Sequence, residues 1–217
     1  MNNINLGLLL PQMIRGMGGT LSVFGLTALL ALPLGLLAAA GRMSKLRVIS
    51  YPVRAYLLIM RGTPLMLQLF FFYFGPYYIF GIRGANRFVM CIVAFVLNYA
   101  AYFAEIYRGG LSSIPEGQYE AAAALGFTKR QTFFKIILPQ VIKRITPPMG
   151  SEFMSLVKDT SLARVIAVFE LFEVARTAAD GAGSVVPFIV AGVFYLIMNT
   201  VVENAFRLAE KKLGYYR

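Results

Sequence analysis

Long stretches without a charged residue limit what this chain can fold into. Charged residues are absent from 16–41, 62–82, 88–104 and 181–202, which are 26, 21, 17 and 22 residues long. A helix needs roughly 20 mainly apolar residues to cross about 30 Å of hydrocarbon. Only 14% of the 217 residues are charged, against about 25% in an ordinary soluble domain. The sequence therefore predicts an all-α integral membrane protein.

The composition excludes several kinds of chemistry. The chain has no histidine and one cysteine, Cys91, so it can form neither an internal disulfide nor a Cys/His zinc site. The dipeptide Gly-Lys is absent, which rules out the usual glycine-rich phosphate loop in this chain. We expect no catalytic residue, no metal site and no cofactor bound by this chain. We also expect no removable signal peptide, since residues 1–10 carry no basic residue.

The positions of the basic residues orient the predicted spans. The net charge is +11, and 14 of the 21 lysines and arginines fall in three clusters. These are Arg42, Lys45, Arg47 and Arg54; Arg108, Lys129, Arg130, Lys135, Lys143 and Arg144; and Arg207, Lys211, Lys212 and Arg217. Because short cytoplasmic loops accumulate positive charge, all three clusters are predicted to face the cytoplasm. They flank apolar segments instead of covering a solvated face, so no nucleic-acid partner is expected.

An even number of crossings must then separate each cluster from the next. Two spans, at about 55–80 and 86–107, lie between the first two clusters. Between the last two clusters, the span at 184–206 needs a partner, and the candidate is 146–169, whose 24 residues reach about 36 Å as a helix. With a first span at 18–41, we predict five transmembrane helices, the N-terminus outside and the C-terminus cytoplasmic. Because charged residues interrupt 146–169, a re-entrant or surface helix there is the alternative.

Residues 108–145 form the one long polar loop, and they predict two short helices. Ser113 is expected to cap the first helix, and Gly126 to stop it in a left-handed conformation. A T-x-x-Q pattern that begins at Thr128 predicts a capping box for the second helix. Pro139 is expected to end that helix.

This loop resembles a known signature. Glu120-Ala121-Ala122, then Gly126, then Ile136-x-Leu138-Pro139 is similar to the complete EAA signature of ABC importer permeases. Other segments resemble the polar amino acid uptake branch of that family: Arg61-Gly62-Thr63-Pro64, Tyr102 to Gly110, Ser113 to Gln118, and Lys158-Asp159-Thr160-Ser161-Leu162. The resemblance extends from about Gly18 to the C-terminus.

The resemblance implies an amino acid import machine in the cytoplasmic (inner) membrane of a prokaryote. Such a machine has two permease subunits, two cytoplasmic ATPase subunits that bind ATP and Mg, and an extracytoplasmic amino-acid-binding protein. The permease pair can be a homodimer or a heterodimer, and we favour the homodimer. Between spans three and four, Glu120, Ala121, Ala122 and Gly126 would belong to a cytoplasmic coupling helix. Glu120 is expected to pair with a basic group of the ATPase.

Charges inside the predicted fourth span need partners or water, since each costs about 2.5 to 3.5 kcal/mol at the bilayer centre. Glu152 and Asp159 are seven residues apart, nearly on one helical face, and could line one cavity. Two carboxylates there favour a cationic or zwitterionic solute, and arginine, histidine and lysine are the candidates. Unwound backbone near Asp159, Thr160 and Ser161 would add amide and carbonyl groups to this cavity.

Several of these polar residues also have a structural interpretation. Lys158 and Asp159 either contact the solute or form interhelical pairs with charged residues of neighbouring spans. Asn98 and Tyr102 lie four residues apart on the predicted third span, so they share a face. They either complete the solute cavity or make interhelical hydrogen bonds.

Two other kinds of function are less well supported by the sequence. A channel subunit would leave the EAA signature unexplained. Ser155-x-x-Lys158 matches the nucleophile pattern of some acyl enzymes. This match covers four residues and no second motif accompanies it, so we reject an enzyme.

Overall fold

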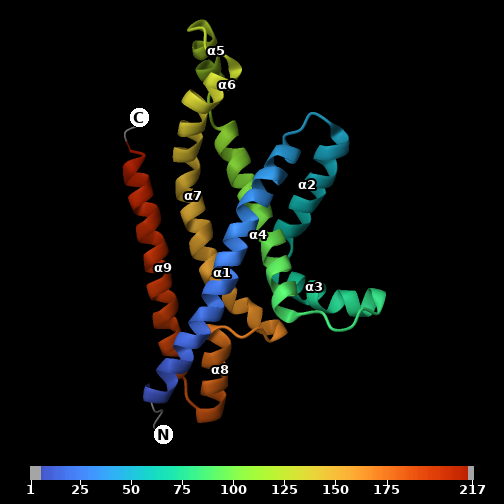
Figure 1. Cartoon of the computed structure of the whole chain (residues 1–217), viewed down its shortest axis with the longest axis vertical. Coiled ribbons are helices and arrows are strands. Elements are labelled where there is room, and N and C mark those ends of the chain that lie inside the picture. Colours follow the sequence, from blue (N-terminus) through green and yellow to red (C-terminus); the bar gives the residue numbers. More distant parts are fainter. Residues whose placement is uncertain (1–5, 215–217) are drawn as a thin grey trace.

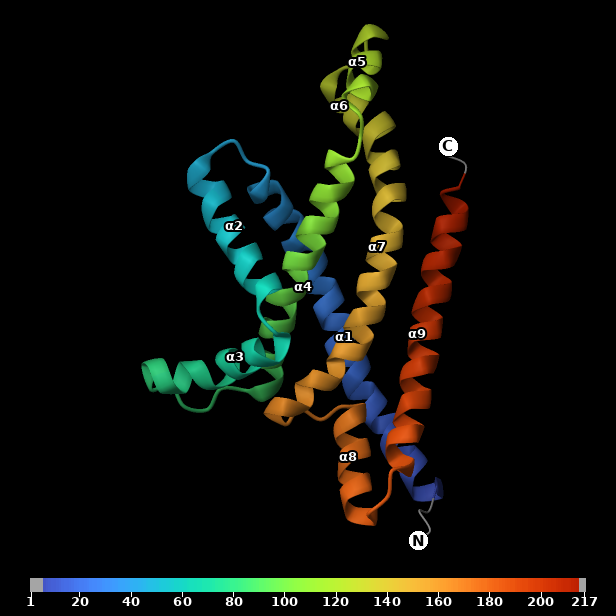
Figure 2. The same cartoon turned by 180° about the vertical axis from the view of Figure 1, so that it is seen from behind.

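The computed structural model describes residues 6–214, which form helices and connecting turns and no β-strand. Four long helices build an elongated bundle: α1 (Leu6–Arg42), α4 (Arg87–Ser112), α7 (Leu138–Asp159) and α9 (Val186–Lys212) (Figures 1 and 2). The prediction about a signal peptide concerns residues 1–10, of which 1–5 lie outside the described residues.

The two ends of the bundle differ. One end carries α5 (Glu116–Ala124) and α6 (Lys129–Gln131), together with the end of α1 and the end of α9 (Figure 1). We call it the basic end, because the described members of the three clusters of lysine and arginine, all except Arg217, lie in or beside these elements. The opposite end carries α8 (Leu171–Ala182) and the start of α1.

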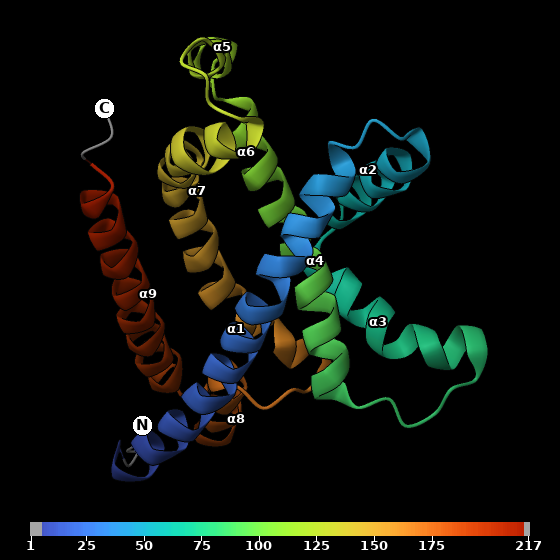
Figure 3. The ribbon, with the colours of Figure 1, turned by 45° about the horizontal axis from the view of Figure 1, so that its top comes forward.

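Small residues let α1 and α4 cross in close contact (Figure 3). A Cβ atom at Gly35 of α1 would lie 2.8 Å from the Cβ of Phe103 and 3.0 Å from the carbonyl oxygen of Ala100. Ala39, one turn further along α1, is 2% exposed. The small residues of the first span therefore face a neighbouring helix, as membrane helix interfaces often require.

Aromatic side chains fill the space between α4, α7 and α9. Phe95, Tyr99 and Phe103 of α4 are fully buried. The ring of Phe103 stacks on Phe153 of α7 with centroids 5.6 Å apart, and Phe153 lies 5.2 Å from Phe206 of α9. Such ring pairs bury large apolar areas with defined geometry. They fix the relative positions of the three helices.

The predicted span at 55–80 is not one continuous helix. α2 (Arg47–Gly62) and α3 (Leu65–Phe80) meet at an angle of 111°, and α3 points away from the bundle (Figure 2). Pro64 is the cause, because it has no N–H group and it forces the preceding residue out of helical geometry. Thr63 is extended, with φ −121° and ψ 147°. By length and composition the pair forms either a broken span or a re-entrant loop.

The other predicted spans are helical, but their limits differ from the predicted ones, most of all at the first span, where α1 begins at Leu6 and not at 18. Within residues 6–214, α1, α4 and α9 are long and apolar enough to cross a membrane. The predicted fourth span, 146–169, corresponds to α7 followed by the 3₁₀ helix η2 (Thr160–Ile166). The expectation of unwound backbone at 159–161 is therefore wrong, because the chain tightens there. The left-handed residue Ala167, with φ 55°, ends η2.

Two predictions about the polar loop are also wrong. Ser113 ends α4 instead of starting α5, and its hydroxyl donates to the carbonyl oxygen of Gly110 at 2.7 Å. Pro139 does not end a helix, because α6 continues through the π-helix η1 (Thr132–Ile137) into α7. Pro139 lies in the first turn of α7, where a missing N–H is tolerated. The sequence pattern cannot show this change of helical register.

Gly35→Ala is expected to lower the stability by about 1–3 kcal/mol, because the added methyl group must displace Phe103 or the α4 backbone. Gly25→Ala, on the same helix, is the matched control, since nothing lies within 4 Å of its Cβ position. Thermal unfolding of both variants in detergent measures the difference. Equal midpoints would contradict the close crossing of α1 and α4.

Candidate functional site

Asn98 of α4 holds the break between α2 and α3. Its side-chain nitrogen donates to the carbonyl oxygen of Met60 and to the amide oxygen of Gln68, both at 3.0 Å. Gln68 donates in turn to the carbonyl oxygens of Met60 (2.9 Å) and Thr63 (3.1 Å), and to the Thr63 hydroxyl (2.8 Å). Carbonyls at the end of a helix lack partners within that helix. Asn98 is 4% exposed, and both its N–H groups serve this interhelical network.

Asp159 at the end of α7 is paired with a tyrosine and not with a basic residue. The hydroxyl of Tyr99 donates to Asp159 Oδ2 at 2.7 Å. Tyr99 is 1% exposed. Lys158 points outward, and it makes no ion pair within residues 6–214. The interhelical ion pairs considered for Lys158 and Asp159 are therefore not formed in this part of the chain.

Glu152 lies two turns before Asp159 on α7 and interacts electrostatically with it. Arg61 of α2 is the second charged group that acts on Glu152. The Arg61 guanidinium lies 5.6 Å from the ring centroid of Tyr102. Glu152 is half-buried, and among the described residues its carboxylate has no hydrogen-bond or ion-pair partner. The structure thus places Glu152, Asp159, Tyr102 and Arg61 in one neighbourhood.

Thr160 and Ser161 direct their hydroxyls to their own helix. Thr160 Oγ1 donates to the carbonyl oxygen of Val157 and Ser161 Oγ to that of Lys158, both at 2.7 Å. Thr160 is fully buried and Ser161 is half-buried. Both hydroxyls satisfy carbonyl groups where α7 changes into the 3₁₀ helix.

A second charged cluster surrounds Glu105 of α4, and the sequence did not predict it. Its carboxylate is 3.3 Å from Arg42 of α1, 3.7 Å from Arg61 of α2 and 2.8 Å from Arg108 of α4. The partners come from three helices. Arg108 lies three residues after Glu105 on α4, whereas Arg42 and Arg61 lie on other helices, and no spacing in the sequence links them to Glu105. Arg61 belongs to this cluster and also reaches the neighbourhood of Glu152.

Glu170 is another buried carboxyl that sequence reasoning missed. It lies at the N-terminus of α8, outside the predicted spans, and accepts hydrogen bonds from the backbone N–H groups of Phe172 and Glu173, both at 2.7 Å. The hydroxyl of Tyr195 on α9 donates to it at 3.0 Å. Burial raises the pKa of Glu170 to about 7. Glu170 ties α8 to α9 at the end opposite α5.

The predicted stop of α5 at Gly126 is confirmed. Gly126 has φ 76°. Its N–H donates to the carbonyl oxygen of Ala123 at 2.9 Å, and the N–H of Phe127 donates to that of Ala122 at 3.0 Å. This is the Schellman arrangement, which satisfies the last carbonyls of a helix. The capping box predicted at Thr128 is also present.

α5 lies at the tip of the basic end (Figure 3), and most of its residues are exposed. Glu120 and Ala121 are exposed, whereas Ala122 is 1% exposed. Leu125, at the end of the same helix, is 77% exposed although it is apolar. α5 is therefore fixed on its inner side and open to a partner on its outer side.

No group of three or more His, Cys, Asp or Glu residues that could hold a metal ion occurs between residues 6 and 214. The carboxylates described above are spread over α4, α7 and α8, and those with partners bind arginine, tyrosine or backbone groups.

The chain is similar to known transport proteins. Residues 31–215 match the family described as "Binding-protein-dependent transport system inner membrane component". In Bacillus subtilis (strain 168), it is 35% identical to the "Probable amino-acid ABC transporter permease protein YckA", over 95% of this chain and 91% of that protein. It is 36% identical to the "L-cystine transport system permease protein TcyB" of the same strain, over 95% and 88%.

A solved structure has the same fold. It is described as "Crystal structure of an amino acid ABC transporter with histidines" and superposes with a TM-score of 0.89 at 30% identity, over 98% of this chain and 99% of that chain.

Asn98→Ala is expected to lower stability by about 1–3 kcal/mol, because it leaves the buried amide oxygen of Gln68 without a donor and removes one of the two donors to the Met60 carbonyl. Asn204→Ala is the matched control, since Asn204 is exposed on α9. Thermal unfolding in detergent compares the two variants. A midpoint for Asn98→Ala equal to that of the control would show that the network does not hold the α2–α3 break.

Proposed function

Because this chain belongs to the family of binding-protein-dependent transport system inner membrane components, we propose that it forms the translocation pathway of an ATP-driven amino acid importer. The amino acid ABC transporter permeases among its relatives support the solute class. The ATPase that drives the cycle would be a separate chain carrying ATP and Mg, and this permease would perform no bond chemistry. The bacterial relatives support a place in the cytoplasmic (inner) membrane of a prokaryote.

We propose five crossings, formed by α1, the bent pair α2–α3, α4, α7 and α9. The first and second basic clusters flank the α2–α4 segment, and the second and third flank α7–α9. The ends of α1 and α9 lie with α5 at the basic end (Figure 1), as an even number of crossings between clusters requires. This arrangement supports a cytoplasmic basic end, with the start of α1 and α8 outside.

The coupling contact is assigned to Glu120, Ala121, Ala122 and Gly126. A helix whose end is fixed by a left-handed glycine moves as one body, whereas a loose loop would absorb the motion of a partner. The exposed Glu120 and Leu125 would face the ATPase, and Ala122 would hold α5 against its own chain. Glu120 would pair with a basic group of the ATPase.

The solute is proposed to be a polar amino acid with a basic side chain, such as arginine, lysine or histidine. The half-buried Glu152, which has no ion-pair or hydrogen-bond partner in residues 6–214, carries this proposal. An unpaired charge in apolar surroundings is costly, and a cationic side chain between Glu152 and Asp159 would remove that cost. Arg61, beside them over the ring of Tyr102, would meet a solute carboxylate.

A second permease subunit is required, because five crossings are few for enclosing a pathway. We favour a homodimer, with a heterodimer as the alternative. α3 supports a subunit contact, since it points away from its own bundle (Figure 2) and exposes Tyr78 and Phe80 at 78% and 73%. An extracytoplasmic amino-acid-binding protein would deliver the solute to the end that carries α8.

Glu152→Gln is expected to lower arginine uptake at least about tenfold, because a charged contact with the solute contributes about 1.5–3 kcal/mol. Glu203→Gln is the matched control, since Glu203 is exposed on α9 and pairs with Arg207 one turn away. Uptake into vesicles that contain the complete importer measures both variants.

Competition in the same vesicles tests the solute class. Unlabelled lysine and histidine are expected to compete with labelled arginine better than glutamine or glutamate does. Stronger competition by glutamate would overturn the basic solute, and equal loss of uptake in Glu203→Gln would overturn the role of Glu152.

Gly126→Asp is expected to reduce uptake per ATP hydrolysed, because a residue other than glycine costs about 1–2 kcal/mol at this positive φ and deforms the end of α5. Gly117→Asp is the control: it lies on the same helix, has no positive φ, and has nothing within 4 Å of its Cβ position. Uptake and ATP hydrolysis are measured on the complex purified through a tag on this chain. Absence of an ATPase from that complex would contradict ATP-driven import, and unchanged coupling in Gly126→Asp would contradict the role of α5.

A further inference from the structure

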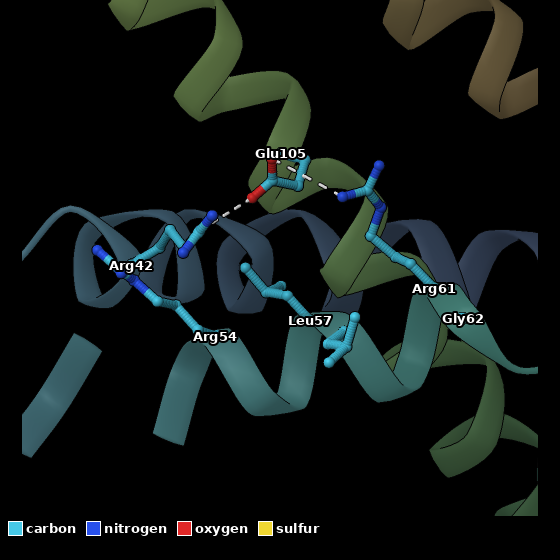
Figure 4. Close-up of a pocket in the computed structure, with 7 residues that line it drawn as sticks. Arg42, Arg54, Leu57, Arg61, Gly62 and Glu105 are labelled. Carbon is cyan, nitrogen blue, oxygen red and sulfur yellow. Dashed lines mark hydrogen bonds and ion pairs between the residues drawn. The ribbon is translucent and has the colours of Figure 1, made fainter. Parts of the chain in front are cut away.

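A cavity of about 440 Å³ lies between α1, α2 and α4, and Arg42 at the end of α1 is part of its lining. Its lining residues come from three helices and are Arg42, Arg54, Leu57, Leu58, Arg61, Gly62 and Glu105 (Figure 4). We call it the arginine cavity. Neither Glu152 nor Asp159 lines this cavity, and Arg61 is the residue that the two sites share. The proposed translocation pathway assigns no role to the other lining residues.

The arginine cavity carries an excess of positive charge. Arg42 and Arg61 approach the Glu105 carboxylate from opposite sides (Figure 4), at 3.3 and 3.7 Å. Arg108 takes the same carboxylate from outside the cavity at 2.8 Å. Three arginines and one glutamate in the lining leave two positive charges without a counter-charge. Arg54 forms no ion pair with any carboxylate of the described chain, and its guanidinium lies 5.7 Å from the ring centroid of Tyr51.

This arrangement suits a phosphate group. Guanidinium groups bind phosphate oxygens through pairs of parallel hydrogen bonds, and an anion between Arg42 and Arg54 would reduce the repulsion between them. Glu105 repels a phosphate group, so its removal is expected to strengthen binding if the arginines are the binding groups.

The walls of the arginine cavity are apolar on one side. Leu57 is 4% exposed, whereas Leu58 is 74% exposed at the outer edge. Gly62 has no side chain to close the far end, and nothing lies within 4 Å of its Cβ position. The arginine cavity therefore has a charged centre and an exposed apolar edge. This combination suits a phospholipid, in which a charged headgroup is joined to apolar acyl chains. Basic residues at a membrane surface attract anionic lipid headgroups.

We propose that the arginine cavity is a binding site for a phosphate group at the basic end of the protein. An anionic phospholipid such as phosphatidylglycerol and a free phosphate carry the same binding chemistry. In either case the anion would add a contact between the end of α1 and α2, beside the ion pairs that Glu105 makes with Arg42 and Arg61.

Binding is tested on the complex purified through a tag on this chain, in detergent, by native mass spectrometry. Phosphatidylglycerol, phosphatidylcholine and inorganic phosphate are the three probes. Arg54→Gln is expected to weaken binding of the anionic probe about tenfold, because it removes the charge-assisted hydrogen bonds that Arg54 in the cavity lining would donate to the phosphate. Arg47→Gln is the matched control, because Arg47 is an exposed arginine of the same helix that does not line the cavity.

Glu105→Gln gives a prediction of opposite sign. It removes the one negative charge of the lining, so the anionic probe is expected to bind more tightly than in the wild type. If the ion pairs of Glu105 only stabilise the fold, Glu105→Gln would weaken the binding of the anionic probe or leave it unchanged. Thermal unfolding of wild-type protein with each probe supplies a readout that does not depend on the folding of any variant.

The results with the three probes distinguish a phospholipid from free phosphate as the source of the bound phosphate group. Retention of phosphatidylglycerol over phosphatidylcholine, lost in Arg54→Gln and kept in Arg47→Gln, supports a lipid site. Stabilisation and binding by inorganic phosphate alone, with the same pattern of variants, supports a site for a free phosphate. The proposal is overturned if neither anionic probe binds, or if Arg54→Gln and Arg47→Gln weaken binding equally.

Discussion

The high cost of leaving a charge or a backbone polar group unpaired in apolar surroundings determines much of this structure. Glu105 is surrounded by Arg42, Arg61 and Arg108, and Asp159 accepts a hydrogen bond from Tyr99. Asn98 and Gln68 supply donors to the carbonyls that the break between α2 and α3 leaves free. Glu152 is the exception among these groups, since its carboxylate has no such partner in residues 6–214. The functional proposal for Glu152 follows from that exception.

A continuous run of helix connects the proposed coupling contact with the carboxylates of the pathway. The capping box at Thr128 starts α6, which continues through the π-helix η1 into α7 and reaches Asp159. α5 is joined to the start of this run by the Schellman turn at Gly126. A displacement of α5 would reach Glu152 and Asp159 along this run, which includes the π-helix η1 and two prolines of α7, Pro147 and Pro148. Coupling through connected helices is consistent with the rocking motions of transporters.

Much of the fold could be predicted because membrane insertion depends on local properties of the chain. The uncharged stretches predicted α1, α4 and α9, and the stop at Gly126 and the capping box at Thr128 follow from short-range geometry. The errors occurred where a local rule competed with a neighbouring element. Pro64 lies within an apolar stretch that predicts one span. The chain instead turns by 111° there, and Asn98 of α4 donates hydrogen bonds to the residues at the break. Pro139 lies where a π-helix makes a proline tolerable.

The amino-acid sequence was sufficient to predict a helical membrane protein, the loop that carries basic residues, and the shared helix face of Glu152 and Asp159. The pairing of the charges, in contrast, depends on the tertiary structure. Glu105 meets arginines 63 and 44 residues before it, and Asp159 meets Tyr99 60 residues before it. Periodicity and spacing describe neighbours within one helix, whereas these partners lie on different helices. Their contacts depend on how the aromatic core and the crossing at Gly35 orient whole helices, and no local pattern encodes that orientation.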